Sequence, residues 1–188
     1  MAEDYAEVGR QAHLRAPRIA VSALRRVILG IDPGIANCGW GMIQENGRTL
    51  SAVAWGCIET PAKTPSGERL WRIHQELLDV AHTWKPTSAA YEHPWLGGAH
   101  PPAALLLGRV VGVVELLWEE YDREMGESIM PLAAYSPTEV KQATTMRGLA
   151  QKWEVGRMVR VILGMETVPT PDHAADALAV AITHAMKT

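Results

Sequence analysis

Cysteine is scarce in this chain, and its apolar runs are short. Cys38 and Cys57 are the two cysteines among 188 residues, too few for the disulfide framework of a small secreted protein. No apolar run approaches the roughly 18 residues that a membrane-spanning helix needs, and no signal-type apolar core opens the chain. These absences argue against a disulfide-bonded scaffold and a membrane protein. We therefore expect a soluble, cytoplasmic protein with reduced thiols.

A strong excess of one charge is also absent. The net charge of −3 gives no indication of nucleic-acid binding by itself. The charges are nevertheless unevenly distributed: six acids and one base lie between Glu115 and Glu127, whereas five bases and two acids lie between Ser136 and Met165. A locally basic binding face is one interpretation, and two ordinary solvated helix faces are the other.

The chain is long enough to bury one sizeable core, since 47% of its residues are hydrophobic. Residues 1–25 lack strand or helix periodicity, and we expect them to form a flexible N-terminal extension. Glu3, Asp4 and Glu7 argue against a transit peptide, which would be poor in acids. The sequence therefore predicts one domain, over residues 26–188.

Strand and helix patterns alternate within this domain. We expect strands at 27–32, 39–44, 50–58, 88–92 and 129–134, and helices at 66–84, from 102 to about 120, from 137, and at about 150–163 and 171–186. Asn46-Gly47 predicts a type I′ hairpin turn between the second and third strands. A hairpin followed by alternating helices and strands predicts an α/β fold: a five-stranded mixed sheet flanked by helices on both faces.

Carboxylates stand at the ends of two of these strands. Asp32 follows an apolar run, and burying a carboxylate costs several kcal/mol unless it is paired or bound to a cation. Glu92 ends the strand that a helical crossover would place parallel to the first. His173 and Asp176 share one face of the last helix. Such ligands suit Mg²⁺ or Mn²⁺, and two ions about 4 Å apart can hydrolyse a phosphodiester.

Each of these residues also has an ordinary structural interpretation. Asp32 before Pro33-Gly34 could form a turn, Glu92 could be a surface charge, and His173 could be an ordinary helix residue. Asp176 is harder to explain in this way, because apolar residues surround it. Asp172 fits a helix start, where the macrodipole favours an acid, but it could also be an outer ligand.

One tryptophan differs from the rest. Trp40, Trp55, Trp71 and Trp118 fit apolar faces, and we expect them in the core. Trp95 instead follows Glu92 by three residues in a loop without periodicity, where an aromatic ring could stack on or wedge between bases. A loop residue folded onto the domain is the alternative.

Four segments together resemble the RuvC-type Holliday-junction resolvases of the RNase H-like superfamily. They are residues 29–34 (LGIDPG), the strand end at Glu92, residues 137–142 (PTEVKQ) and residues 173–179 (HAADALA). The resemblance covers about residues 26–186 and implies an RNase H-like fold. It places the family's catalytic and metal-binding positions on Asp32, Glu92, His173 and Asp176, its junction-probing aromatic on Trp95, and its important bases on Lys141 and Lys152.

The resemblance also implies an activity and partners. It implies a homodimer that nicks symmetric strands of a four-way junction, leaves 5′-phosphates and 3′-hydroxyls, and uses two Mg²⁺ ions per active site, with Mn²⁺ as a substitute. A branch-migration helicase is a further implied partner. From the charge pattern we add Arg147 and Arg157 as expected DNA contacts. The helix expected from 102 to about 120 has more apolar residues than a single face packed on the sheet can bury: Val110, Val111, Val113, Val114 and Leu117. Because an exposed apolar surplus favours contact with a partner, we expect dimerisation through this helix.

The chain departs from the family pattern at two places. The loop after Trp95 lacks the usual basic and amide residues, and Arg109 stands without the usual Gln-Ala-Arg-Gly run. The acidic total and the N-terminal extension are also unusual for the family. Together these departures leave the cleavage preference open and favour a divergent member, of phage or plasmid origin. The implied function places its action at the nucleoid. An RNase H-like nuclease for hybrid or branched substrates and a non-cutting junction binder remain alternatives. An actin-like ATPase needs a second domain, for which the chain has no room.

Overall fold

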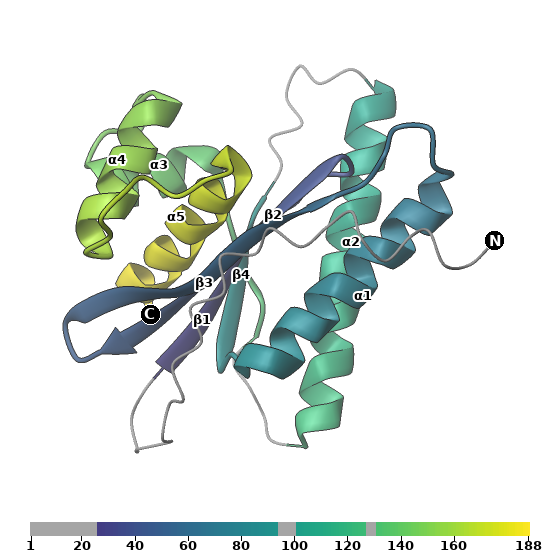
Figure 1. Ribbon diagram of the computed structural model, residues 1–188, viewed down its shortest axis with the longest axis horizontal. Coiled ribbons are helices and arrows are strands. Elements are labelled where there is room, and N and C mark those ends of the chain that lie inside the picture. Colours follow the sequence, from purple (N-terminus) through teal and green to yellow (C-terminus); the bar gives the residue numbers. More distant parts are fainter. Residues whose placement is uncertain (1–25, 94–100, 127–130) are drawn as a thin grey trace.

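The computed structural model describes residues 26–93, 101–126 and 131–188 (Figure 1). The described strands are β1 (Arg26–Asp32), β2 (Asn37–Asn46), β3 (Thr49–Glu59), β4 (Ser88–Glu92) and β5 (Ala133–Tyr135). The described helices are α1 (Ser66–Trp84), α2 (Pro101–Met125), α3 (Pro137–Thr145), α4 (Lys152–Ile162) and α5 (Asp172–Lys187). The predicted flexible extension lies outside the described residues. None of the described helices has the length and apolar character needed to cross a bilayer.

The strands form one mixed sheet in the order β3-β2-β1-β4-β5. β1, β2 and β3 pair antiparallel, whereas β4 runs parallel to both β1 and β5. The predicted five-stranded mixed sheet is therefore confirmed. The parallel pairing of β1 with β4 places the ends of these two strands, with Asp32 and Glu92, on the same edge of the sheet.

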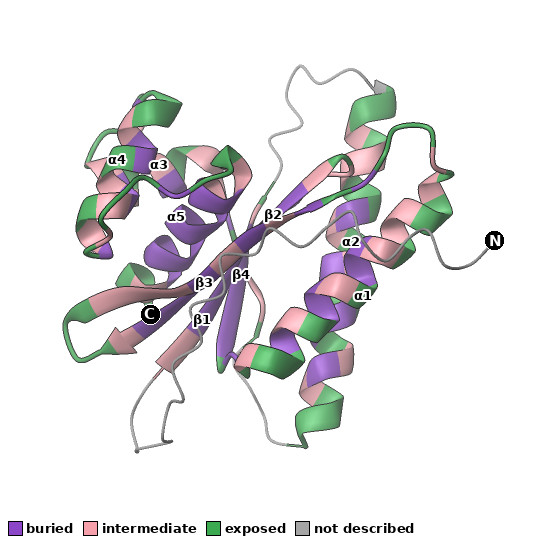
Figure 2. Cartoon of the chain, viewed as in Figure 1, coloured by how far each residue is buried: buried purple, intermediate pink, exposed green. Residues whose placement is uncertain are grey.

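Helices cover both faces of the sheet (Figure 1). α1 and α2 pack on one face, and α5 packs on the other, where α3 and α4 lie against it. A hydrophobic core lies on each face of the sheet, and successive side chains of β1 point alternately into the two cores. Leu29 and Ile31 face α1 and α2, whereas Ile28 faces α5. Asp32 shares the parity of Ile28, so its side chain is directed to the α5 side. Figure 2 shows the buried residues along the strands and on α5.

α5 approaches the sheet over three glycines. A Cβ at Gly30 would lie 2.1 Å from the Ala177 carbonyl oxygen, and one at Gly39 would lie 2.0 Å from the His173 carbonyl oxygen. A Cβ at Gly41 would lie 2.7 Å from Leu178 Cγ. The helix therefore sits closer to β1 and β2 than any side chain would allow, which brings its first turn beside Asp32.

The structure corrects the predicted turn type and the length of one strand. Asn46 pairs with Thr49, so the central turn residues are Gly47 and Arg48. Gly47 has φ +60°, and Arg48 is not among the positive-φ residues. This is the sign pattern of a type II′ turn, which needs a positive φ at its first central residue alone. β5 begins at Ala133 rather than 129, and residues 129 and 130 lie outside the described residues.

Trp71 and the α2 valines also differ from expectation. Trp40 and Trp118 are buried and Trp55 is partly buried, but Trp71 is 64% exposed on the outer side of α1. The prediction that the α2 valines and Leu117 form an exposed apolar surplus was wrong. Val110, Val114 and Leu117 are buried and Val111 and Val113 pack against the same core, whereas the exposed large apolar residues of α2 are Leu105, Leu116 and Met125.

The cysteines lie on neighbouring strands but do not face each other. Cys38 on β2 pairs with Ile58 on β3, so Cys57, the residue before Ile58, points to the opposite face of the sheet. Both thiols are free, and Cys38 is buried. Burial raises the pKa of Cys38 to about 12, which keeps this thiol protonated.

Candidate metal centre

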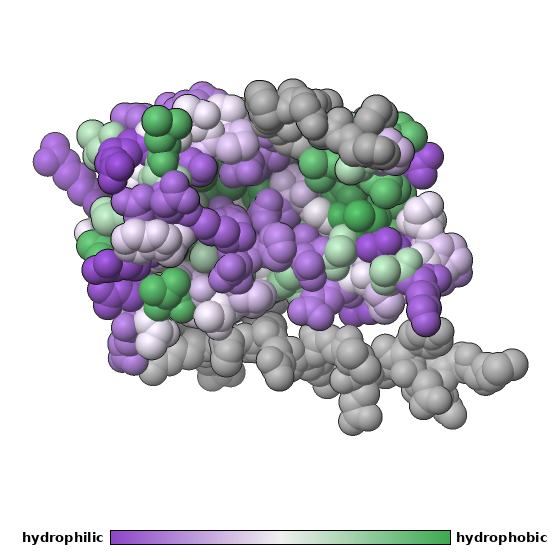
Figure 3. Space-filling model, turned by 90° about the horizontal axis from the view of Figure 1, so that it is seen from above, coloured by the Kyte–Doolittle hydropathy of each residue, from purple (hydrophilic) through white to green (hydrophobic). Residues whose placement is uncertain are grey.

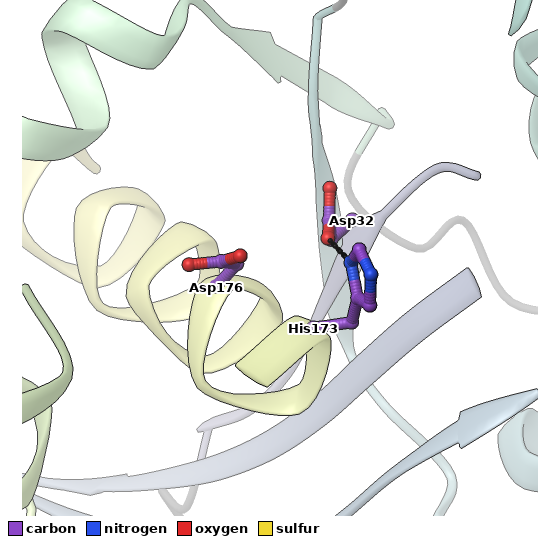
Figure 4. Close-up of side chains that lie close together, drawn as sticks. All are labelled: Asp32, His173 and Asp176. Carbon is purple, nitrogen blue, oxygen red and sulfur yellow. Dashed lines mark hydrogen bonds and ion pairs between the residues drawn. The ribbon is translucent and has the colours of Figure 1, made fainter. Parts of the chain in front are cut away.

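Three potential metal ligands converge where β1 meets α5 (Figure 4). One ligand atom from each of Asp32, His173 and Asp176 lies within 4.8 Å of the other two. All three side chains are partly buried, so the cluster remains accessible to solvent. The structure thus brings together three of the four residues that the sequence predicted.

Asp32 and His173 are directly bonded. His173 Nδ1 lies 2.8 Å from Asp32 Oδ2. This hydrogen bond, with the Asp32 charge, raises the pKa of His173 above its usual value in spite of partial burial. The raised pKa favours the protonated imidazole, whose charge balances that of Asp32.

Asp176 has a different internal cation. Lys152 Nζ, from the first residue of α4, lies 2.7 Å from Asp176 Oδ2 and 3.9 Å from Asp172 Oδ2. Burial nevertheless raises the pKa of Asp176 above its usual value, even though the Lys152 bond opposes this shift. Burial lowers the pKa of Lys152, but the bond to Asp176 and its charge outweigh burial and leave the pKa raised. The sequence did not reveal this pair.

Glu92 lies beside the cluster but outside the group of three. Burial, together with the charges of Asp32 and Asp176, raises the pKa of Glu92 to about 7, while the charges of Lys141 and Lys152 act in the opposite direction. A carboxyl in this state is crowded by like charge, and a bound cation would relieve the crowding. The donor set of three carboxylates and one imidazole fits a hard divalent cation such as Mg²⁺ or Mn²⁺.

The structure gives different surroundings to the predicted DNA contacts. Arg147 pairs with Glu154 at 3.0 Å, and the Arg157 guanidinium carbon lies 5.7 Å from the ring centroid of Trp153. Lys141 lies on α3 near enough to Glu92 to lower its pKa. Trp95 lies outside the described residues. Sequence reasoning gave no role to Trp153, although it follows Lys152 directly in a basic segment.

A family model for crossover junction endodeoxyribonuclease RuvC matches residues 28–184. The chain belongs to the RuvC family. It is 42% identical to RuvC from Heliobacterium modesticaldum, over 83% of this chain and 91% of that protein. The Thermus thermophilus RuvC structure matches with a TM-score of 0.74 and 36% identity, over 85% of this chain and 93% of the other. T. thermophilus RuvC in complex with Holliday junction substrate matches with a TM-score of 0.73 and 35% identity, over 85% and 92% of the two chains.

Membership of the RuvC family confirms several predictions from the sequence. The sheet order and the flanking helices form the RNase H-like RuvC fold. The chain is a crossover junction endodeoxyribonuclease, a metal-dependent hydrolase. The family requirement for a divalent metal agrees with the cluster formed by Asp32, His173 and Asp176.

Proposed function

We propose that this RuvC-family protein resolves four-way DNA junctions by paired symmetric nicks, with Asp32, Glu92, His173 and Asp176 as its catalytic metal ligands. The observation that carries the proposal is the convergence of Asp32, His173 and Asp176 within 4.8 Å, at the end of β1. The T. thermophilus protein that was solved with Holliday junction substrate is 35% identical to this chain, which supports the same substrate here.

The ligand residues would hold two Mg²⁺ ions, with Mn²⁺ as a substitute. Such ions would supply an activated water and a positive charge near the leaving oxygen of the phosphodiester, which would give a 5′-phosphate and a 3′-hydroxyl. Asp32 is held on the rigid end of β1, and His173 and Asp176 are fixed by the close packing of α5 on the sheet. The protein's own contribution is thus a preset ligand geometry.

Lys152 has two roles in this proposal. Its ammonium neutralises Asp176 while no cation is bound, at 2.7 Å. If a bound cation neutralises Asp176 instead, the Lys152 ammonium becomes available for a DNA phosphate. Because the Lys152 side chain is 53% exposed, it can reach solvent and DNA without a change in the fold.

The basic segment from α3 to α4 is the proposed DNA surface. Lys141, Arg147, Lys152 and Arg157 would hold phosphates, and Trp95 would probe the crossover. The Arg147–Glu154 ion pair is no obstacle, because exposed pairs contribute little and the Arg147 side chain is 67% exposed. A phosphate can therefore replace Glu154 as the partner of Arg147.

We also propose a homodimer, because paired nicks in symmetric strands require two sites related by a two-fold axis. Action at the nucleoid, together with a branch-migration helicase, follows from the same function. The division of the chain into residues 1–25 and a single nuclease domain over residues 26–188 also remains a proposal.

Cleavage assays on matched substrates test the function. A mobile four-way junction, a linear duplex, a flap and an RNA–DNA hybrid of the same sequence are incubated with the protein and Mg²⁺. We expect symmetric nicks with 5′-phosphates in the junction, and Trp95→Ala should reduce this cutting without weakening duplex binding. Preferential cutting of the hybrid or flap would favour the RNase H-like alternative. Tight junction binding without cutting would identify a non-cutting binder.

A further inference from the structure

An exposed tryptophan stands next to the residue that contacts Asp176. Trp153 is 62% exposed on α4, and its neighbour Lys152 lies 2.7 Å from Asp176. An indole that is mostly exposed to water adds little to the core, so burial alone does not explain this residue. Figure 3 shows hydrophilic side chains between the two helical layers, with separate hydrophobic side chains on the α3–α4 side, at the left.

Arg157 orients the indole ring. Its guanidinium carbon lies 5.7 Å from the centroid of the Trp153 ring, one helical turn further along α4. A guanidinium over an indole is attracted by the ring quadrupole. One face of the indole is thereby occupied, and the guanidinium keeps hydrogen-bond donors for an anion. A ring restrained in this way loses less entropy when a flat ligand stacks on it.

The charges around Trp153 select the type of ligand. α4 carries Lys152, Arg157 and Arg160 against one acid, Glu154, which is already paired with Arg147. An aromatic ring set among cations suits a ligand that combines flat rings with phosphates, which is a nucleic-acid strand. An acidic protein surface would match the charges but would leave the flat ring unused.

We propose that Trp153 is a specificity-determining DNA contact, which stacks on a base exposed near the crossover while Lys152 and Arg157 hold the flanking phosphates. This inference rests on the proposed junction substrate. A paired duplex covers its base faces, whereas a crossover opens them, so the contact favours branched DNA. Lys152 and Trp153 are consecutive residues at the start of α4, so a strand held by both would pass from the indole toward the proposed metal centre.

Binding assays with three variants test the stacking contact. Trp153→Ala, Trp153→Leu and Trp153→Phe are compared on a four-way junction and a linear duplex, with Ca²⁺ in place of Mg²⁺ to separate binding from cutting. We expect Ala and Leu to weaken junction binding roughly tenfold and Phe to restore most of it, because stacking needs a ring and not bulk. Duplex binding should hardly change.

The chain offers a matched control and a spectroscopic readout. Trp71→Ala removes an equally exposed tryptophan, 64% exposed on α1, and should leave binding to both DNAs unchanged. Trp153 should lose fluorescence when junction is added, measured as the difference between the chain and its Trp153→Phe variant. A purely structural role would not produce this quenching.

Defined outcomes would overturn the inference. Wild-type junction binding by Trp153→Ala, equal loss on junction and duplex, or rescue by Leu would each contradict base stacking. A fall in thermal stability that accounts for the lost binding would assign Trp153 to the fold. These results are distinct from a failure of the proposed function, which would be seen as absence of junction cutting by the unmodified protein with Mg²⁺.

Discussion

At the scale of single residues, the metal-free site is balanced by cations that the chain itself supplies. His173 bonds to Asp32 and Lys152 bonds to Asp176, at 2.8 and 2.7 Å. Two acids that would otherwise repel each other are thereby tolerated near the protein surface. On the proposed metal site, a bound cation would take over the contacts that His173 and Lys152 make with Asp32 and Asp176.

Asp32→Asn and Asp176→Asn should abolish cutting but not junction binding. Each carboxylate supplies a metal ligand, and its loss should slow cleavage by at least about a hundredfold. Junction binding should be unchanged or tighter, because a negative charge that repels phosphate is removed. Single-turnover cleavage with Mg²⁺ and binding with Ca²⁺ separate the two effects. Wild-type cleavage rates in either variant would exclude that residue as a ligand.

His173 should adjust the choice of metal. Imidazole is a softer ligand than carboxylate, so the ratio of Mn²⁺ to Mg²⁺ activity should be higher for the unmodified chain than for His173→Asp. The ratio is measured from cleavage rates at saturating metal. Identical ratios for the two proteins would show that His173 does not contact the ion.

Glu92 should make the metal-free protein less stable as the pH rises. Burial and the neighbouring carboxylates raise its pKa from 4.5 to about 7, so the folded state holds this proton more tightly than the unfolded state. The contribution to stability is complete below about pH 4.5 and is lost as the pH passes 7. Thermal unfolding from pH 4.5 to 8 should show this loss, and Glu92→Gln should reduce it. Excess Mg²⁺ should also reduce it. Parallel profiles for both proteins without metal would contradict the assignment.

The sequence predicted the identity of these ligands better than their partners. Asp32 and Asp176 stood out because each carboxylate is embedded in apolar residues of a regular element. The Lys152–Asp176 bond could not be foreseen, since it depends on how α4 is placed against α5. The absence of Glu92 from the group of three depends on the positions of its side-chain atoms, which a sequence motif does not record.

At the scale of elements, the packing of α5 on the sheet determines where His173 and Asp176 lie relative to Asp32. Gly30, Gly39 and Gly41 remove the side chains that would hold the helix away. The strand and helix patterns predicted both partners correctly, because a two-residue and a 3.6-residue period are visible in the sequence. The short distance between α5 and the sheet was not predicted, because it depends on direct contact between the α5 backbone and the glycine backbone of β1 and β2.

Gly39→Ala should therefore damage both stability and cleavage. The new Cβ would lie 2.0 Å from the His173 carbonyl oxygen, which is backbone and cannot rotate away. We expect a loss of about 2–3 kcal/mol in the free energy of unfolding, and slower cleavage at temperatures where the variant remains folded. Chemical denaturation and cleavage assays measure the two losses.

Gly67→Ala is the matched control for this substitution. A Cβ at Gly67 on α1 meets nothing within 4 Å, so stability should be unchanged or slightly higher. If Gly39→Ala folded and cut DNA as well as Gly67→Ala, close packing of α5 would not be what positions His173.

At the scale of the whole molecule, the two helical layers differ in the sign of their charge. Residues 136–165 carry five bases and two acids, whereas residues 115–127 at the end of α2 carry six acids and one base. DNA should therefore approach the α3–α4 side. The α2 side is left for contact with a second copy, and its acids would repel a strand placed there.

The dimer should form through an exposed stripe on α2. Leu105 and Leu116 are 61% and 63% exposed, and Gly108 and Gly112 lie on the same face, where an added Cβ meets nothing within 4 Å. Leu116→Glu should yield monomers in sedimentation and uncoupled single nicks in a junction. Met186→Glu, at a 54% exposed position on α5, is the control and should leave the dimer intact. A monomeric unmodified protein that still makes paired cuts would refute the dimer.

The separation of the site residues along the chain has a consequence during protein synthesis. Asp32 and its partner His173 are 141 residues apart in sequence. A ribosome-bound chain therefore has no assembled metal centre until α5 has been translated. Products that terminate before α5 lack both His173 and Asp176, so on the proposed site they cannot cut DNA. On this site, incomplete translation does not release an active nuclease.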